Sequence, residues 1–290
     1  MKAAIEEFIA RENLPENYYE TVQLWFIPML EQLLQKVAVN KGTFVVGISG
    51  CQGSGKSTLA SLLVILLRET MGLNSINLSL DDFYLTHSER AQLAAKTHPL
   101  LATRGVPGTH DVALAIRTIQ ALKQPGQVPI VRFNKALDDR APEHAWPVVQ
   151  APVDVIILEG WCLNIPEQNE LELQDPINEL EQQHDRSGIW RQYVNDRIRA
   201  DYRQLYDLVD YLIMLKAPSF EKVFQWRQTQ EDKLAESQQD LSHSKIMSPK
   251  ELKRFIQHYE RITRHGLATL PARADVVFQL TDEQTIKGRA

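Results

Sequence analysis

The most restrictive feature of this chain is an eight-residue stretch with the pattern G-x-x-x-x-G-K-S, at residues 50–57. An apolar run at residues 43–48 precedes it, and a second apolar run at residues 58–67 follows it. This pattern between a strand and a helix predicts a phosphate-binding loop, because glycines let successive backbone N–H groups turn inward around an anion. The N-terminus of the following helix adds further N–H donors and the positive end of its dipole. We therefore expect a nucleoside triphosphate here, with Lys56 on the β- and γ-phosphates and the Ser57 hydroxyl on Mg²⁺.

The composition is that of an ordinary globular protein, with 43% hydrophobic and 24% charged residues. A length of 290 residues suits one large domain, or a domain with an appendage. The net charge of −5 comes from 32 Lys and Arg against 37 Asp and Glu. A balance this close to neutral gives no reason to expect nucleic acid or an acidic membrane surface as a partner.

Several features predict a cytoplasmic protein. The two cysteines, Cys51 and Cys162, have no metal-like spacing, which suggests a reducing compartment. No apolar run approaches the ~20 residues of a membrane span, and residues 1–7 lack the apolar core of a signal peptide. We expect Cys51 to be a small residue that fills a loop position rather than a reactive thiol.

Strands and helices alternate along the chain after the loop. Predicted strands lie at residues 75–80, 127–133, 153–158, 211–215 and 274–280. Predicted helices lie at residues 86–95, 112–123 and 189–208, from residue 218 onward, and at 249–265. This alternation predicts an α/β domain with a mainly parallel sheet flanked by helices and joined by right-handed crossovers.

Two parts of the chain stand apart from that domain. Residues 1–40 carry apolar residues at helical spacing, so we expect an N-terminal helical extension, divided at Pro15 and kinked at Pro28, ahead of a domain at residues 41–290. Residues 164–188 are rich in Glu, Gln, Asn and Asp, which predicts an exposed insertion. A polar linker is expected at residues 236–247.

Acidic residues follow two of the predicted strands. Asp81 and Asp82 end the strand at 75–80, and Glu159 ends the strand at 153–158. Ligands of open α/β sheets collect at the carboxyl ends of the strands. Phosphoryl transfer to a hydroxyl needs a carboxylate that accepts the proton and ligands for Mg²⁺. Asp81 is the candidate base, and Glu159, with Ser57, is the candidate for metal or water positioning.

Basic residues lie in the loops that border these strands. Because guanidinium groups bind carboxylates in a bidentate manner, these loops predict a small anionic acceptor. Arg227 lies on the helix after the strand at 211–215. Two interpretations fit it equally: a lid arginine that reaches the transferred phosphate, or a surface charge. His110 and His144 are assigned no catalytic role. The basic loop residues are Arg104, Arg132, Lys135 and Arg140.

With these residues in view, the chain resembles the P-loop kinases of the phosphoribulokinase, uridine kinase and bacterial pantothenate kinase group. Within that group it is most similar to the plant-type D-glycerate 3-kinase family and its microbial kinase-like relatives. The resemblance covers roughly residues 43–280, and Asn134 stands where this family is expected to have Asp. The stretches that carry it are residues 50–57, Leu80-Asp81-Asp82-Phe83-Tyr84-Leu85-Thr86, residues 104–111, 128–135, Asp139-Arg140-Ala141-Pro142, Leu158-Glu159-Gly160-Trp161 and 224–227.

The resemblance implies a P-loop NTPase fold, ATP as donor with Mg²⁺, Asp81 as the base and a mobile lid around Arg227. Catalysis is expected from Asp81, Lys56 and Glu159. The expected ATP-binding residues are Gly50, Cys51, Gln52, Gly53, Ser54, Gly55, Lys56, Ser57, Thr58 and Arg227. The expected acceptor-binding residues are Asp82, Tyr84, Arg104, His110, Arg132, Lys135 and Arg140.

Alternatives remain open at this point. D-glycerate, a small carboxylate with a primary hydroxyl, is the leading acceptor, and pantothenate or a nucleoside is the next. A different class, a nucleotide-dependent switch, would need an N-K-x-D signature if it used GTP. The stretch Asn134-Lys135-Ala136-Leu137 has leucine where that signature requires aspartate. The sequence makes no prediction about oligomeric state.

Overall fold

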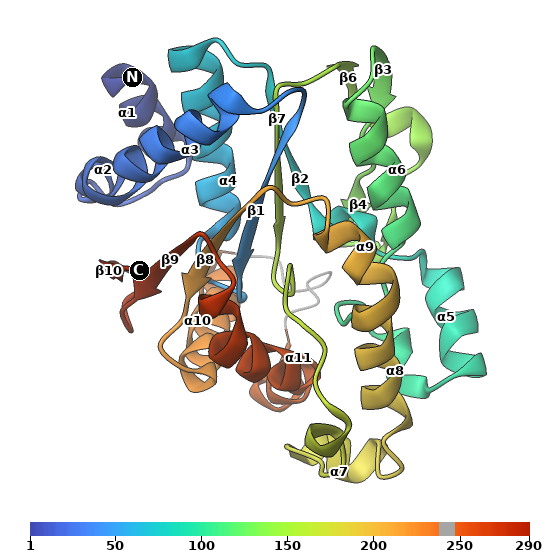
Figure 1. Cartoon of the computed structure of the whole chain (residues 1–290). Coiled ribbons are helices and arrows are strands. Elements are labelled where there is room, and N and C mark those ends of the chain that lie inside the picture. The colour runs from blue at the N-terminus through green and yellow to red at the C-terminus, as the bar shows by residue number, and fades with distance from the viewer. Residues whose placement is uncertain (238–246) are drawn as a thin grey trace.

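The computed structural model describes the backbone of residues 1–237 and 247–290 and the side chains of residues 1–229 and 247–290. Within these residues the chain forms a central sheet surrounded by helices (Figure 1). The strands of this sheet are β1 (Phe44–Gly50), β2 (Ser75–Ser79), β7 (Val155–Gly160), β8 (Tyr211–Lys216), β9 (Val276–Leu280) and β10 (Ile286–Arg289). Their order is β10-β9-β8-β1-β7-β2, with β10 antiparallel to β9 and the other neighbours parallel. The predicted α/β fold with a mainly parallel sheet is confirmed.

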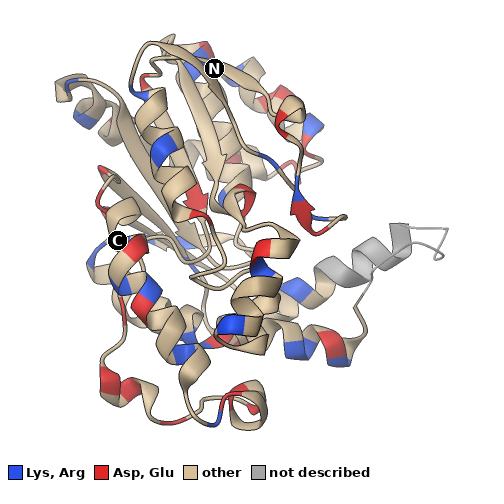
Figure 2. Ribbon diagram, turned by 90° about the vertical axis from the view of Figure 1, so that its right-hand side faces the viewer, with Lys and Arg blue, Asp and Glu red and all other residues tan. Residues whose placement is uncertain are grey.

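Two inner strands of the sheet, β1 and β7, are buried along their whole length. Strands covered on both faces read as continuous apolar runs, which is why both were recognisable in the sequence. Figure 2 shows that charged residues lie mainly on helices and loops, while the strands of the sheet carry few. In the parallel register, Glu159 on β7 pairs with Ile48 on one side and with Ser79 on the other. The phosphate loop and the end of β2 therefore meet at one edge of the sheet.

The N-terminal segment consists of α1 (Lys2–Arg11), α2 (Tyr18–Thr21) and α3 (Ile27–Val39). Pro15 separates α1 from α2, as predicted. A π-helical turn at Val22–Phe26 joins α2 to α3 immediately before Pro28, so the irregularity expected at this proline is a wide turn. Phe8 and Met29 are fully buried, and the ring of Phe26 packs edge-on against that of Phe278, with centroids 5.4 Å apart. The segment therefore packs on the core of the sheet.

The helices after β1 in the described chain include two with reciprocal N-terminal caps. Thr86 and Ser248 each accept a hydrogen bond from the backbone N–H of a glutamate three residues later, whose side chain bonds back to the cap. The expected polar linker lies mostly outside the described residues. These helices are α4 (Lys56–Ile65), α5 (His87–Lys96), α6 (Val112–Leu122), α7 (Glu179–His184), α8 (Ile189–Arg197), α9 (Arg203–Tyr206), α10 (Phe220–Ser237) and α11 (Pro249–Thr269).

The strand expected at residues 127–133 is not part of the central sheet. Its first half is β3 (Gly126–Pro129), which pairs antiparallel with β6 (Val148–Ala151). Its end belongs to β4 (Phe133–Asn134), which pairs with β5 (Asp139–Arg140). Pairing partners of short strands are set by tertiary contacts, so their assignment to a sheet could not be read from the local pattern. Strand β10 was not predicted, because its sequence, Ile-Lys-Gly-Arg, has no apolar alternation.

The insertion at residues 164–188 was predicted to be exposed. This prediction is wrong for two of its acidic residues. Glu181 and Asp185 are buried, and each carboxylate is bound by an arginine. Arg261 on α11 lies 2.6 Å from Glu181, and Arg191 on α8 lies 3.0 Å from Asp185. Acidic residues are buried only when paired, and composition alone does not show partners that are distant in sequence.

No helix in residues 1–237 and 247–290 combines the length and the apolar character that crossing a bilayer requires.

Candidate active site

The phosphate loop has the backbone geometry that its glycines predict. Gly53 and Gly55 have φ angles of +79° and +85°, in the left-handed region that other residues rarely adopt. A Cβ atom at Gly50 would collide with the side chain of Ser54, so glycine is also required for close packing there. Helix α4 begins at Lys56 and directs its N-terminal N–H groups into the loop. Cys51 is buried in the loop, and this burial raises its pKa to about 12, so the thiol is protonated at neutral pH.

Ser57 and Glu159 lie together beneath the loop. The Ser57 hydroxyl donates a hydrogen bond to Glu159 Oε1 at 3.0 Å, and Lys56 Nζ lies 3.9 Å from Glu159 Oε2. Glu159 is 4% exposed, and its Oε2 is buried without a hydrogen-bond partner. A hydroxyl beside an under-coordinated carboxylate suits Mg²⁺, which uses one or two protein oxygens together with substrate phosphates. The residues present therefore fit this ion.

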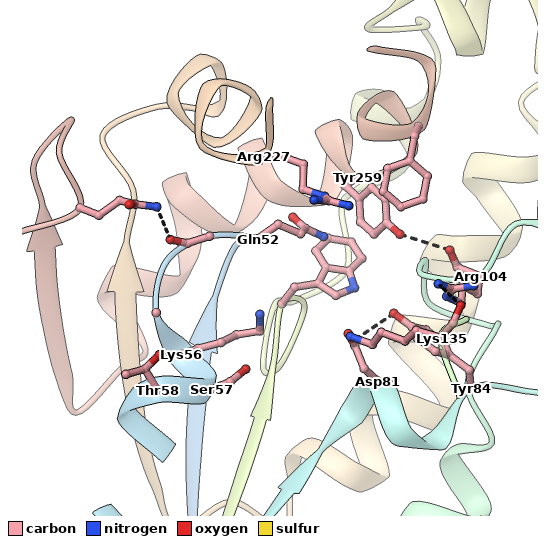
Figure 3. A pocket seen from close by; sticks show the side chains of 15 residues that line it. Gln52, Lys56, Ser57, Thr58, Asp81, Tyr84, Arg104, Lys135, Arg227 and Tyr259 are labelled. Atoms are coloured by element: carbon pink, nitrogen blue, oxygen red, sulfur yellow. Dashed lines mark hydrogen bonds and ion pairs between the residues drawn. The ribbon is translucent and has the colours of Figure 1, made fainter. Parts of the chain in front are cut away.

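A cavity of about 610 Å³ opens between the phosphate loop and the end of β2 (Figure 3). Figure 3 shows Lys56, Ser57 and Thr58 on one side of it, Asp81, Lys135 and Arg104 on the other, and Arg227 and Tyr259 above. The cavity is therefore large enough to join a triphosphate site to a second, small molecule. Its walls are formed by Gln52, Gly53, Gly55, Lys56, Ser57, Thr58, Asp81, Tyr84, Arg104, Lys135, Trp161, Arg227, Phe255, Tyr259 and Gln284.

Asp81 faces this cavity from a 3₁₀ turn at Leu80–Phe83 that follows β2. Its carboxylate accepts a hydrogen bond from the Tyr84 hydroxyl at 2.8 Å and pairs with Lys135 Nζ at 2.8 Å. Burial raises the pKa of Asp81, but Lys135, Lys56 and the two hydrogen bonds outweigh it and lower that pKa to about 2. Asp81 is therefore ionised at neutral pH. Burial also raises the pKa of Tyr84, so its hydroxyl remains a donor.

Arg104 lies on the same side of the cavity as Asp81 and is held in place by several contacts. Its guanidinium pairs with Asp138 and lies over the ring of Phe133, 5.4 Å from the ring centroid. Asp138 also binds the buried Arg90, at 2.7 Å. One carboxylate thus fixes two arginines, and the two cations at this end of the cavity are Arg104 and Lys135.

Four of the predicted acceptor-binding residues do not line the cavity. Asp82 accepts hydrogen bonds from the backbone of Phe133 at 3.0 Å and from Arg132 at 3.1 Å. Arg140 donates to the backbone carbonyl of Tyr84 at 3.1 Å and lies 3.5 Å from Asp111. These three charged side chains, Asp82, Arg132 and Arg140, hold β4 and β5 against the end of β2.

The fourth, His110, lies behind Tyr84. Its ring stacks on that of Tyr84, with centroids 4.5 Å apart, and its Nδ1 contacts the Tyr202 hydroxyl. Burial lowers the pKa of His110 to about 4, so the ring is neutral at pH 7 and offers no positive charge to an anion.

Three aromatic residues and one amide in the cavity wall were not predicted as site residues. Trp161 donates from Nε1 to the carbonyl of Gly105 at 2.9 Å, and Tyr259 donates to the carbonyl of Arg104 at 3.2 Å. The rings of Trp161 and Tyr259 pack edge-on at 4.9 Å. Phe255 and Tyr259 lie four residues apart on α11. Apolar residues at this spacing also form the face of a helix that packs on the core, so the sequence could not show that these two line a cavity. The amide is Gln284, which donates to the Gly53 carbonyl at 2.7 Å.

Comparisons with known proteins place this geometry in a family. Residues 45–165 match the model of the Phosphoribulokinase / Uridine kinase family. The chain is 34% identical over 227 residues to the uncharacterized kinase mug58 of Schizosaccharomyces pombe, covering 74% of this chain and 78% of that protein. It is 29% identical over 269 residues to the chloroplastic D-glycerate 3-kinase of Arabidopsis thaliana, covering 86% of this chain but only 55% of that protein. The solved D-glycerate 3-kinase from Cryptococcus neoformans var. grubii serotype A superposes with a TM-score of 0.73 and 26% identity, over 90% of this chain and 95% of that one.

Proposed function

The chain belongs to the phosphoribulokinase/uridine kinase family and is an ATP-dependent small-molecule kinase. We propose that it phosphorylates a hydroxyl of a small anionic metabolite, and that this metabolite is D-glycerate. The observation that carries this proposal is the single cavity that joins the phosphate loop, the Asp81 carboxylate and the side chains of Lys135 and Arg104. The D-glycerate 3-kinases of Arabidopsis thaliana and Cryptococcus neoformans among its relatives support the same acceptor.

The proposed reaction is an in-line transfer. The acceptor hydroxyl oxygen forms a bond to the γ-phosphorus while the bond from that phosphorus to the β,γ-bridging oxygen breaks, and ADP leaves with the electron pair. The hydroxyl proton passes to Asp81, which is ionised and held by Tyr84 and Lys135 at the cavity wall. Lys56 and Arg227 would hold the transferred phosphate, which carries negative charge in the transition state.

Ser57 and Glu159 would hold Mg²⁺ in this scheme. The ion would supply neutralisation of charge on the β- and γ-phosphates. The buried Oε2 of Glu159, which lacks a hydrogen-bond partner, supports this assignment.

The acceptor end of the cavity suits a short carboxylate. Lys135 lies 2.8 Å from Asp81, and Arg104 lines the same side of the cavity, so an acceptor with a carboxylate near its reacting hydroxyl would meet positive charge there. The rings of Tyr259 and Trp161, packed edge-on with their centroids 4.9 Å apart, also line this cavity. D-glycerate has this arrangement of carboxylate and primary hydroxyl.

A screen of ADP release tests the proposal. The purified chain is assayed with MgATP and, in turn, D-glycerate, pantothenate, uridine, ribulose 5-phosphate and the neutral analogue glycerol. We expect turnover with D-glycerate and little with glycerol, and loss of that turnover in Lys56→Ala. ADP release with pantothenate or uridine but not with D-glycerate would replace the acceptor while keeping the reaction class. Slow hydrolysis that no acceptor stimulates would refute the transfer reaction.

A further inference from the structure

A second cavity, of about 240 Å³, adjoins the phosphate loop. Gly53, Gly55 and Thr58 line both this cavity and the one described above, as does Gln284, so the loop and the turn that holds Gln284 separate them. In Figure 3, Thr58 lies on the side of Lys56 that faces away from Asp81. The other walls come from the N-terminal segment and from β8, β9 and β10 with the turn between the last two: Leu14, Pro15, Asn17, Tyr18, Thr21, Phe26, Leu215, Leu280, Glu283, Gln284, Thr285 and Ile286.

The direction of a bound triphosphate follows from the loop itself. In this motif the backbone N–H groups hold the α- and β-phosphates, and the lysine reaches the β- and γ-phosphates. The γ-phosphate therefore points toward Lys56, Glu159 and the Asp81 cavity. The α-phosphate lies at the opposite end, and the nucleoside must leave the loop on the side of Thr58, where the second cavity opens.

The walls of the second cavity have the composition of a site for a flat heteroaromatic ring. Tyr18, Phe26 and Leu280 offer apolar surface, and Asn17 and Thr21 add polar groups at one side. Pockets for small ligands commonly combine apolar walls with a few polar groups that fix orientation. An aromatic base with hydrogen-bonding edges meets both requirements.

The N-terminal segment is fastened to the end of the sheet that forms the other wall. Lys36 on α3 pairs with Asp275 at 3.4 Å, and Gln32 accepts a hydrogen bond from Arg289 on β10. On the opposite wall, Gln284 is tied to the Gly53 carbonyl, so the turn between β9 and β10 is anchored on the phosphate loop. The cavity is thus bounded by segments that these contacts tie to one another, and Figure 1 shows α2, β9 and β10 on the same side of the molecule.

We propose that residues 14–26, together with the turn between β9 and β10, bind the base of the donor nucleotide. The N-terminal helices, which precede the region matched by the family model at residues 45–165, are then part of the ATP site. The inference rests on the proposed function only in taking the loop as the triphosphate site, and it is independent of the acceptor.

The test separates the base from the phosphates by using two ligands. Calorimetry measures the affinity of the full chain for MgATP and for magnesium tripolyphosphate, which has the phosphates but no nucleoside. Thr21→Trp fills the cavity with an indole. Leu24→Trp is the matched control, because Leu24 is in the same segment, is 67% exposed and does not line the cavity. Asn17→Trp is a second filling variant at an exposed position whose side chain caps no helix, so it should fold even if Thr21→Trp does not.

We expect the filling variants to weaken MgATP by at least about tenfold and to leave tripolyphosphate affinity within about twofold. Leu24→Trp should change neither. Unchanged MgATP affinity in a folded filling variant would overturn the inference while leaving the kinase assignment intact. Equal losses for both ligands would also overturn it, because the segment would then act on the loop rather than on the base. Failure of the wild-type chain to bind either ligand would instead remove the proposed function, and this inference with it.

Discussion

Replacing Lys135 with methionine removes the ammonium group that lies 2.8 Å from Asp81 Oδ2 and keeps a long, unbranched side chain. If Lys135 binds the carboxylate of the acceptor, the variant should lose affinity for an anionic acceptor and not for a neutral one. The substitution should also raise the pKa of Asp81, because the charge of Lys135 no longer offsets the effect of burial on that carboxylate.

The size of the first effect follows from charge and exposure. Two unit charges ~4 Å apart attract by ~1 kcal/mol in water and ~4 kcal/mol at an effective dielectric constant near 20. The Lys135 side chain is 63% exposed, so solvent screening places the value near the lower limit. We expect a loss of about 1–2 kcal/mol, which is a fall in kcat/KM for D-glycerate of roughly 5- to 30-fold.

The second effect has a definite sign. A carboxylate with a lowered pKa is in its active, ionised form above that pKa. It becomes protonated and inactive as the pH falls below that pKa. With a pKa of about 2, Asp81 should place no acid limb on the wild-type rate above pH ~4. Loss of Lys135 should raise the pKa of Asp81, so the rate of the variant should begin to fall at a higher pH than that of the wild type.

The assay is ADP release, quenched and quantified by chromatography, between pH 4 and pH 8. Lys96→Met is the control, because it removes the same charge from an exposed position on α5 that does not line the cavity. A Lys135→Met variant with kcat/KM for D-glycerate within about twofold of wild type would show that this lysine does not recognise the acceptor. An equal loss of kcat/KM with glycerol would show that Lys135 does not act through its charge on the acceptor.

Three other variants give independent tests. Asp81→Asn should lower kcat by about 10²–10⁴-fold in the ADP-release assay and leave ATP affinity nearly unchanged in equilibrium dialysis; near-normal turnover would exclude it as the base. Gly105→Ala should cost about 1–3 kcal/mol in urea unfolding, because φ is +134° and the new Cβ would overlap the ring of Tyr259, whereas Gly42→Ala, with φ +104° and open space, should cost less. Arg261→Met leaves a buried carboxylate unpaired and should destabilise the fold by about 3–5 kcal/mol, and a loss below 1 kcal/mol would contradict a buried ion pair.

The residues that were predictable are those whose role follows from local geometry. The phosphate loop needs glycines at fixed positions, and a parallel strand buried on both faces has an unmistakable apolar run. Asp81 and Glu159 could be placed near the loop because carboxyl ends of parallel strands share one edge of the sheet. The register of Glu159 with Ser79 and Ile48 bears this out.

The residues that were placed wrongly are those whose direction depends on neighbours distant in sequence. Asp81 and Asp82 are adjacent on a tight 3₁₀ turn, so one side chain faces the cavity and the other binds Arg132 and the backbone of Phe133. The sequence treats Arg132 and Lys135 alike, yet only Lys135 reaches the cavity.

The sequence by itself therefore determined the fold class, the phosphate loop and the two strand ends that face it, because each rests on a spacing of a few residues along one element. Only the tertiary structure decided which basic residues line the cavity beside Asp81, and that buried arginines hold Glu181 and Asp185. It also decided that residues of the segment 14–26 line the same cavity as residues of the phosphate loop. Each of these depends on contacts between segments that are far apart in the chain, where the direction of a side chain is fixed by packing and charge pairing rather than by its neighbours in sequence.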